Sequence, residues 1–328
     1  MRLPKKRANT RLMVVMSNSK EVQWIKVAEA QVGQRLDNFL LRRMKGVPKS
    51  RIYRLIRRGE VRVNKKRCKP ERKLEMSDQV RIPPYSGIDS PQVAKPGLAM
   101  QEFLLASILF EDEQLLVINK PAGLAVHGGS GIRLGAIEAL RQCKPEWGEL
   151  ELAHRLDLAT SGCLVISKKS IFLKHIQKEL KARNVKKNYL ALVHGSWPEN
   201  LKEIDAPLMK EAVSERERVV KVNEAGKPSL TRFFVKERYS AATLLEVMPE
   251  TGRTHQIRVH CQHAGHSIVG DPKYTSRVRG GELSQVKNLC LHAWKIQFSL
   301  PESTALVKVE APLDNHLNSL LSKIGNSE

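Results

Sequence analysis

Residues 154–162 read HRLDLATSG and lead directly into the apolar run CLVI at residues 163–166. A short apolar run of this kind is typical of a buried strand, so the nonapeptide is predicted to form the loop before it. Loops on a rigid sheet commonly present functional side chains. Asp157 is therefore the candidate catalytic residue, and the alternative is that it only caps a turn or pairs with Arg155.

Further apolar runs on both sides of this loop predict more strands of the same domain. They lie at residues 115–118, 189–193 and 243–247, while helical periodicity appears at residues 171–181 and 255–264. No fixed period of self-similarity is present, which argues against a solenoid or a propeller. The mixture of strands and helices predicts an α+β domain over residues 104–328.

The excess positive charge of the 328-residue chain is concentrated in its front third. Residues 1–100 hold 25 Lys and Arg against 8 Asp and Glu, whereas the remaining residues hold 31 against 26. A field of this sign attracts phosphate groups without reading base sequence. We therefore expect a nucleic acid partner, and the alternative is a basic surface that is merely solvated.

The front third also contains the pattern of two helices and a hairpin. Apolar residues recur at helical spacing within residues 33–44, and a second helix is expected between an N-cap at Ser50 and a stop at Gly59. Residues 61–63 and 80–82 alternate apolar and basic positions, as short antiparallel strands do. The basic side chains expected to bind RNA are Arg51, Arg54, Arg57 and Arg58 on the second helix and Lys65 and Lys66 in the turn.

Composition shifts divide the chain into four segments. Residues 1–20 carry six basic residues and no acid, and we expect a basic extension there. An organelle transit peptide or a later true start remains an alternative. Residues 21–84 form the predicted RNA-binding domain. Residues 85–103 are rich in Pro and Gly and are expected to be an extended linker to the domain at 104–328.

The chain shows no pattern of a secreted or membrane-spanning protein. Its five cysteines are odd in number and far apart, which fits a reducing compartment. No apolar run approaches the ~18 residues of a transmembrane helix. We therefore expect a cytoplasmic protein that makes no membrane contact.

Two other motifs are weak indicators of chemistry. The Gly-rich run HGGSG at residues 127–131 fits neither GxxxxGK[ST] nor GxGxxG, so it gives little support to nucleotide binding. HExxH is absent and the later histidines match no standard zinc spacing, so we assign no metal and keep a metal hydrolase only as a disfavoured alternative. Those later side chains are His255, His260, Cys261, His263 and His266.

The nonapeptide resembles the catalytic motif of the large-subunit ribosomal RNA pseudouridine synthases. Three further segments agree with that family in the same order: NKPAG with AVHGG within 119–129, NYLALV at 188–193, and GRTHQIRVH at 252–260. Residues 33–83 resemble the small RNA-binding module first known from a small-subunit ribosomal protein. The resemblance is nearest to the C-type members. Leu158 and Ala159 replace the Arg-Asp of many relatives, which leaves the choice of uridines open.

The resemblance implies an α+β catalytic domain with a mixed, mainly antiparallel sheet, preceded by a small helix-helix-hairpin RNA-binding domain. It implies isomerisation of specific uridines in 23S ribosomal RNA by a monomer, with base flipping and no cofactor. Whether the aspartate adds covalently to the substrate or removes a proton on the way to a glycal stays open. A non-enzymatic RNA-binding or ribosome-assembly factor would explain the charge pattern equally well.

The same resemblance implies roles for individual residues. Asp157 is the nucleophile or base, and Arg258 is the cation that keeps this carboxylate charged. Tyr189 stacks on the flipped uracil. The residue-based alternatives are a surface phosphate contact for Arg258 and a core position for Tyr189. The implied substrate-binding residues are Arg155, Ile257 and His127.

Overall fold

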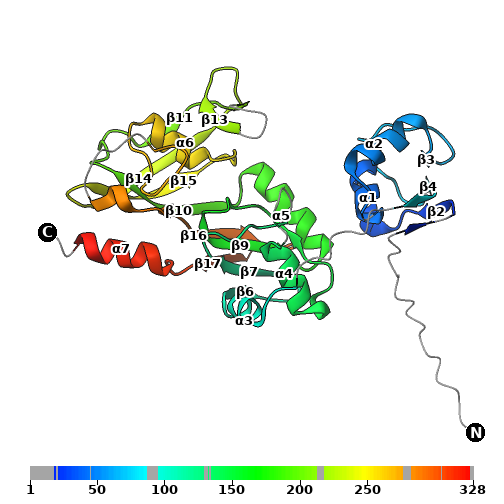
Figure 1. Cartoon of the computed structure of the whole chain (residues 1–328), viewed down its shortest axis with the longest axis horizontal. Helices are drawn as coiled ribbons and strands as arrows, with labels where there is room; N and C mark the ends of the chain where they lie inside the picture. The colour runs from blue at the N-terminus through cyan, green and yellow to red at the C-terminus, as the bar shows by residue number, and fades with distance from the viewer. Residues whose placement is uncertain are drawn as a thin grey trace, which may run out of the picture. The chain divides into compact units, whose positions relative to one another are not determined.

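The computed structural model describes residues 18–19, 21–44, 46–86, 95–128, 132, 134–212, 218–275, 282–303 and 305–325 (Figure 1). The chain divides into two compact units, Met1–Ala94 and Lys95–Glu328. Most of the basic extension predicted at 1–20, and residues 87–94 of the predicted linker, lie outside the described residues. Each unit is described by itself below.

The front unit is the predicted arrangement of two helices and a small antiparallel sheet. Leu36, Phe39, Ile52 and Ile56 are buried between the two helices and the sheet, as the helical spacing predicts. The sheet has the order β2-β4-β3. The elements of this unit are β1 (Asn18–Ser19), β2 (Gln23–Lys26), η1 (Glu29–Gln31), α1 (Leu36–Arg43), α2 (Lys49–Arg58), β3 (Arg62–Val63), β4 (Gln79–Ile82) and β5 (Tyr85–Ser86).

The two ends of helix α2 differ in how well the sequence predicts them. Gly59 ends the helix with φ of 72°, in the left-handed region that favours glycine, as expected. The N-cap expected at Ser50 is wrong, because the helix begins at Lys49 and Pro48 occupies the cap position. Pro48 can stand at this point because the first helical amides have no partner within the helix.

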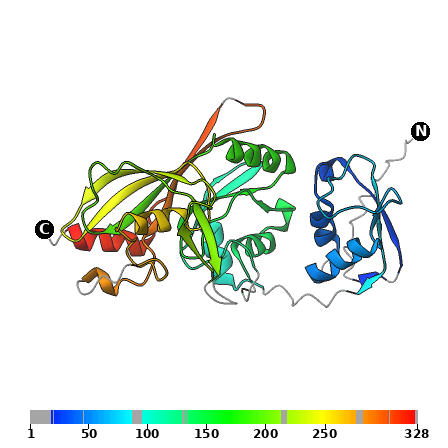
Figure 2. The same cartoon turned by 90° about the horizontal axis from the view of Figure 1, so that it is seen from above.

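The larger unit is an α+β domain built on one long sheet. Among the described residues the strands follow the order β11-β14-β15-β10-β16-β9-β7-β6, with β17 on β16 and β8 on β9. Neighbours are antiparallel except for the pair β16 and β9, so the predicted mixed, mainly antiparallel sheet is confirmed. In Figure 2 the β16–β17 hairpin, coloured orange, extends beyond the rest of the sheet.

Four predicted strands of this sheet are confirmed, and their apolar runs explain their positions. Residues 115–118, 163–166, 189–193 and 243–247 lie in β7, β9, β10 and β15. All seven residues of β9 are buried, because the strand is central in the sheet. The strand bounds are β6 (Ile108–Glu111), β7 (Leu115–Lys120), β8 (Glu151–Leu152), β9 (Ser161–Ser167), β10 (Lys186–His194), β11 (Glu203–Asp205), β12 (Leu208–Ala212), β13 (Arg218–Val222), β14 (Leu230–Arg238), β15 (Ala242–Pro249), β16 (Leu291–Ser299) and β17 (Leu306–Glu310).

Helices pack on this sheet, and a short separate hairpin lies beside one of them. Both predicted helices are confirmed as α5 and α6, and α6 contacts β13, β14 and β15 (Figure 1). Strands β12 and β13 form a two-stranded sheet of their own, and Leu208 of β12 makes a further antiparallel bridge with Lys227. The helices are α3 (Leu98–Ala106), α4 (Ala136–Cys143), η2 (Pro145–Trp147), α5 (Ser170–Ala182), α6 (Gln256–His263), η3 (Glu282–Gln285) and α7 (Asn315–Gly325).

The extended linker expected over residues 85–103 is wrong at both ends. Tyr85–Ser86 pairs with the short strand β1, and helix α3 begins at Leu98. The second unit therefore starts at Lys95 rather than at residue 104. Leu104 of α3 is fully buried in the core of the catalytic unit, which explains why this segment folds as a helix. Among the described residues, no helix is long and apolar enough to cross a membrane.

Strands β9 and β16 approach each other closely at the end of the loop that carries Asp157. Gly162 is the second residue of β9 and has a φ of 106°, and a Cβ at this position would lie 2.2 Å from the carbonyl oxygen of Ala293 on β16. The parallel pairing of His292 with Ser161 and of Ala293 with Gly162 lies at the same point. Only glycine allows the two strands to come this close.

Candidate active site

Asp157 lies in the loop between β8 and β9, and backbone hydrogen bonds hold this loop on the sheet. The amide of Thr160 donates to the carbonyl oxygen of Asp157 over 3.1 Å. The half-buried ring of His154 accepts a hydrogen bond from the Val165 amide at Nε2, and burial lowers its pKa to about 4. His154 therefore stays neutral and acts as a fixed acceptor for the strand.

A buried lysine supports the same loop from the next strand. Lys120 ends β7 with no solvent exposure, and its ammonium donates to the carbonyl oxygens of Pro121, Leu124 and Leu158. Burial lowers its pKa to about 8, while the charge of Asp157 opposes this shift. Lys120 thus ties together the two segments on which the NKPAG and HRLD motifs lie.

Arg258, on helix α6, places its guanidinium between two carboxylates. Its Nη1 lies 3.5 Å from Oδ2 of Asp157, and its Nε and Nη2 donate to Asp271 over 2.7 and 2.8 Å. Burial alone would lower the pKa of Arg258, but the hydrogen bonds and charge of Asp271, together with Asp157, raise it above its ordinary value. The guanidinium is therefore a permanent charge aimed at Asp157.

The fully buried side chain of Asp271 is what orients that guanidinium. Its carboxylate also accepts the backbone amides of Lys273 and Tyr274 at Oδ1. Burial would raise the pKa of Asp271, yet the hydrogen bonds and charge of Arg258 and these amides hold it below its ordinary range. The two hydrogen bonds from Arg258 and the two backbone amides compensate the buried charge of Asp271, which is the condition under which a buried ion pair is tolerated.

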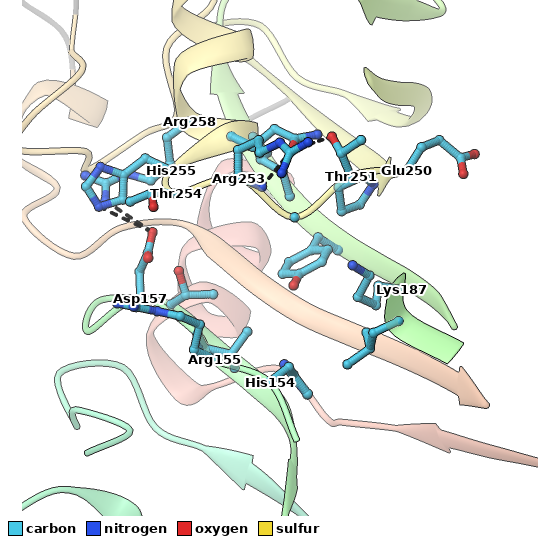
Figure 3. Close-up of a pocket in the computed structure, with 18 of the residues that line it drawn as sticks. His154, Arg155, Asp157, Lys187, Glu250, Thr251, Arg253, Thr254, His255 and Arg258 are labelled. Atoms are coloured by element: carbon cyan, nitrogen blue, oxygen red, sulfur yellow. Dashed lines mark hydrogen bonds and ion pairs between the residues drawn. The ribbon is translucent and has the colours of Figure 1, made fainter. Parts of the chain in front are cut away.

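His255 approaches the same carboxylate from the N-terminus of α6. Its Nε2 lies 3.7 Å from Oδ2 of Asp157 (Figure 3). Its Nδ1 lies 2.8 Å from the hydroxyl oxygen of Tyr274. The residue adopts φ of 55° as the N-cap of the helix, which is uncommon for a residue other than glycine. Burial lowers the pKa of His255 below its ordinary value.

Asp157, Arg258 and His255 line a pocket of about 560 Å³, a volume in the range of small-ligand sites. Asp157, Arg258, Tyr189, Arg155 and Ile257 all line it, so the structure brings together five residues that the motifs singled out. Burial raises the pKa of Tyr189 well above its ordinary value, and the charge of Asp157 adds to this shift, so the phenol keeps its proton.

His127 is not among the residues that line this pocket. Its ring is exposed and its Nδ1 lies 2.8 Å from the carbonyl oxygen of Gly128. Residues 129–131 of the Gly-rich run lie outside the described residues. The role of His127 in substrate binding stays a prediction.

The later histidines have separate partners rather than a common centre. His260 is buried and contacts Thr231 and the carbonyl oxygen of Ala206, whereas His266 contacts the carbonyl oxygen of His194. In the part of the chain that the structure describes, no group of three or more His, Cys, Asp or Glu is arranged to hold a metal ion. Sequence reasoning gave His255 no role beside Asp157 and missed Asp271 and Tyr274.

The basic face predicted on the front unit is present. Arg54, Arg57 and Arg58 are exposed on α2, while Arg51 is half-buried. Lys65 and Lys66 are exposed in the turn after β3, where Lys65 has a φ of 65°. The apolar residues of the same helix are buried, so α2 presents a basic side to solvent.

Comparison with known proteins identifies the family. The model described as RNA pseudouridylate synthase matches residues 114–263, and the S4 domain model matches residues 34–80. The chain is 48% identical over 312 residues to the ribosomal large subunit pseudouridine synthase C of Salmonella typhimurium, covering 94% of this chain and 98% of that protein. The chain belongs to the RNA pseudouridylate synthase family. The family predicted from the four motifs is confirmed.

Other relatives of this synthase agree. The protein of the same name from Pasteurella multocida is 48% identical and covers 92% of this chain and 94% of its own length. Among solved structures, human RNA pseudouridylate synthase domain containing 4 superposes with a TM-score of 0.58 at 25% identity. That alignment covers 69% of this chain and 96% of the human chain, so the fold of the catalytic unit is confirmed as well.

Proposed function

We propose that the synthase converts specific uridines of large-subunit ribosomal RNA into pseudouridines, with Asp157 as the nucleophile. The observation that carries this proposal is the ion pair of Asp157 with Arg258 in a pocket that Tyr189 also lines. The named relatives support the substrate class, because each of them is a ribosomal large subunit pseudouridine synthase.

The reaction is an isomerisation whose atoms balance without a second reactant. The bond between N1 of uracil and C1′ of ribose breaks, the base turns, and a bond forms between C5 and C1′. The proton lost from C5 is matched by the proton gained at N1. No electron is transferred overall, so the groups required are a carboxylate, a cation and a surface that holds the base.

Asp157 supplies the carboxylate, which can act as a nucleophile toward a carbon centre of the substrate. Its side chain is 22% exposed, so substrate can reach it, and the guanidinium of Arg258 stabilises its charge when the base closes the pocket. Tyr189 offers an aromatic face for stacking, and its phenol keeps its proton for hydrogen bonding.

Base flipping is part of the proposal, because enzymes that do chemistry on a base cannot reach their target atoms while the base is stacked inside a duplex. The rim of the pocket is rich in cations that suit the phosphates on either side of the flipped nucleotide. Arg155 is exposed at this rim and is proposed to occupy the space that the base leaves. The other rim cations are Lys181, Arg183, Lys187 and Arg253.

The front unit is proposed to anchor the RNA through the exposed cations of α2 and the turn after β3. All groups that the reaction needs lie in the pocket of one chain, which supports action as a monomer without a cofactor. A ribosomal RNA substrate supports a cytoplasmic location.

The test is to map pseudouridines in unmodified large-subunit ribosomal RNA incubated with the protein, by carbodiimide labelling and reverse-transcription stops. Wild type and the control Asp205→Asn, which changes an exposed aspartate on β11, should give the same new stops. Asp157→Asn should give none while still binding RNA. Stops from Asp157→Asn at the wild-type level would contradict the nucleophile. Absence of stops from wild type on rRNA and on ribosomal precursors would favour the RNA-binding factor instead.

A further inference from the structure

We infer that His255, held by Tyr274, is a positioning residue that fixes one oxygen of Asp157 and leaves the other to meet the ribose. The inference rests on the proposed function, because it concerns the carboxylate of the same reaction. It adds to the site a neutral hydrogen-bond donor that is distinct from the cation Arg258.

The proton positions follow from the contacts of Tyr274. The backbone amide of Val220 on β13 donates to the hydroxyl oxygen of Tyr274 over 3.0 Å. Burial raises the pKa of this phenol, so it keeps its own proton, and the acceptor within reach is Nδ1 of His255 at 2.8 Å. A neutral imidazole that accepts at Nδ1 carries its single proton at Nε2, and Nε2 faces Asp157.

The surroundings of His255 keep it in this neutral form. The charged groups around the ring are Asp157 and Asp271, which favour an imidazolium, and Arg258 and Lys273, which disfavour it. Burial acts in the same direction as Arg258 and Lys273, and the pKa of His255 is lowered below its ordinary value. The Tyr274 proton at Nδ1 opposes protonation there as well, since a second proton would leave two donors facing each other.

Both donors converge on the same oxygen of the carboxylate. Nη1 of Arg258 and Nε2 of His255 lie 3.5 and 3.7 Å from Oδ2, and among the described residues no hydrogen bond or ion pair reaches Oδ1 (Figure 3). Such distances commonly shorten when substrate closes the site. The geometry therefore assigns Oδ1 as the oxygen that meets the ribose, while Oδ2 is fixed.

The backbone of His255 adopts an uncommon conformation in this arrangement. Its φ of 55° lies in the left-handed region, which asparagine visits readily because its short polar side chain hydrogen-bonds locally. The ring nevertheless has an edge contact with the Tyr274 ring, which packs with Val220 and Val259 in a small apolar cluster. The side chain, rather than the backbone, is thus the reason for histidine at this position.

Two substitutions of His255 separate the side-chain role from the backbone role. The amide nitrogen of glutamine can occupy the place of Nε2, whereas asparagine reaches only the place of Nδ1. His255→Gln should keep single-turnover pseudouridine formation within about fivefold of wild type. His255→Asn should lower that rate by about 10- to 100-fold with RNA affinity unchanged. A merely structural role predicts the opposite order, because asparagine suits φ of 55° better.

Tyr274→Phe tests the other end of the relay and keeps the ring that packs against the cluster. Loss of the phenol proton at Nδ1 should raise the pKa of His255 and shift the acid limb of the pH–rate profile upward by about half a unit or more. An unchanged acid limb in the pH–rate profile of Tyr274→Phe would overturn the assignment. A faster single-turnover rate for His255→Asn than for His255→Gln would overturn it as well.

A readout that does not need turnover separates this inference from the proposed function. Nitrogen NMR of ¹⁵N-histidine-labelled full-length protein should show His255 protonated at Nε2 and bare at Nδ1 at neutral pH. A proton at Nδ1, or an imidazolium, would refute the relay even if the protein formed no pseudouridine. Absence of pseudouridine with wild-type enzyme, by contrast, would refute the proposed function.

Discussion

Arg258→Lys tests whether the shape of the guanidinium, and not its charge alone, supports Asp157. Arg258 serves two carboxylates at once through three nitrogen atoms. A lysine ammonium is a single point charge. It should pair with Asp271, because the carboxylate of Asp271 is fully buried and would be costly to leave without a cation. We therefore expect Asp157 to lose its cation while the fold is kept.

The size of the loss follows from the distance. Two unit charges 3.5 Å apart interact by about 5 kcal/mol at an effective dielectric constant of about 20. Asp157 is 22% exposed, so solvent and the remaining donor His255 reduce this figure to roughly 2–3 kcal/mol. That range corresponds to about 30- to 160-fold in rate.

The assay is single-turnover release of tritium from RNA labelled at C5 of uracil, since this hydrogen leaves during the reaction. RNA affinity is measured on the same samples and should change little. Arg141→Lys is the matched control, because Arg141 donates to the Leu150 carbonyl oxygen and does not line the pocket. A folded Arg258→Lys variant that turns over within threefold of wild type would refute the reasoning.

Three further predictions concern stability and binding. Gly162→Ala should lower the free energy of unfolding by about 3 kcal/mol or more in urea titrations, because a Cβ there meets the Ala293 carbonyl oxygen at 2.2 Å with φ of 106°; a loss under 1 kcal/mol would contradict the close approach. The hydrogen bond from Arg35, with that from Tyr53, lowers the pKa of Asp37 to about 2, below its unfolded value of 3.8. Its stabilisation is therefore complete above about pH 4 and is lost as the pH falls toward 2, so Asp37→Asn should flatten the acid limb of stability against pH. Replacing Arg54, Arg57 and Arg58 together by Gln should reduce the salt slope of RNA binding by about one unit per lost phosphate contact, and an unchanged slope would exclude α2 from the interface.

The parts of the fold that could be predicted from the sequence are those set by local pattern. The run at residues 163–166 predicts β9 because the strand is buried on both faces, and Gly59 predicts the end of α2 because the backbone needs a positive φ there. Helix α3 was not predicted, because Pro96 and Gly97 directly before it are typical of a linker. The burial of Leu104 also depends on residues that are distant in the sequence.

The candidate site divides in the same way. Resemblance of the motifs pointed to Asp157, Tyr189 and Arg258, and the structure places them in one pocket. Asp271 and Tyr274 could not be found this way, since the loop after α6 that brings them back to the helix has no periodic pattern. Their partners become visible only when hydrogen bonds are traced through the folded chain.

The order of strands in the sheet also governs when the protein becomes able to react during its own synthesis. Strand β16, which joins β10 to β9, begins only at Leu291. Until that segment has left the ribosomal exit tunnel, the half that carries Asp157 and the half that carries Arg258 have no shared strand between them. The front unit, complete by Ser86, can fold and hold RNA much earlier. The front unit of a nascent chain can therefore fold before the catalytic sheet is complete, and the pocket is assembled only after β16 has emerged.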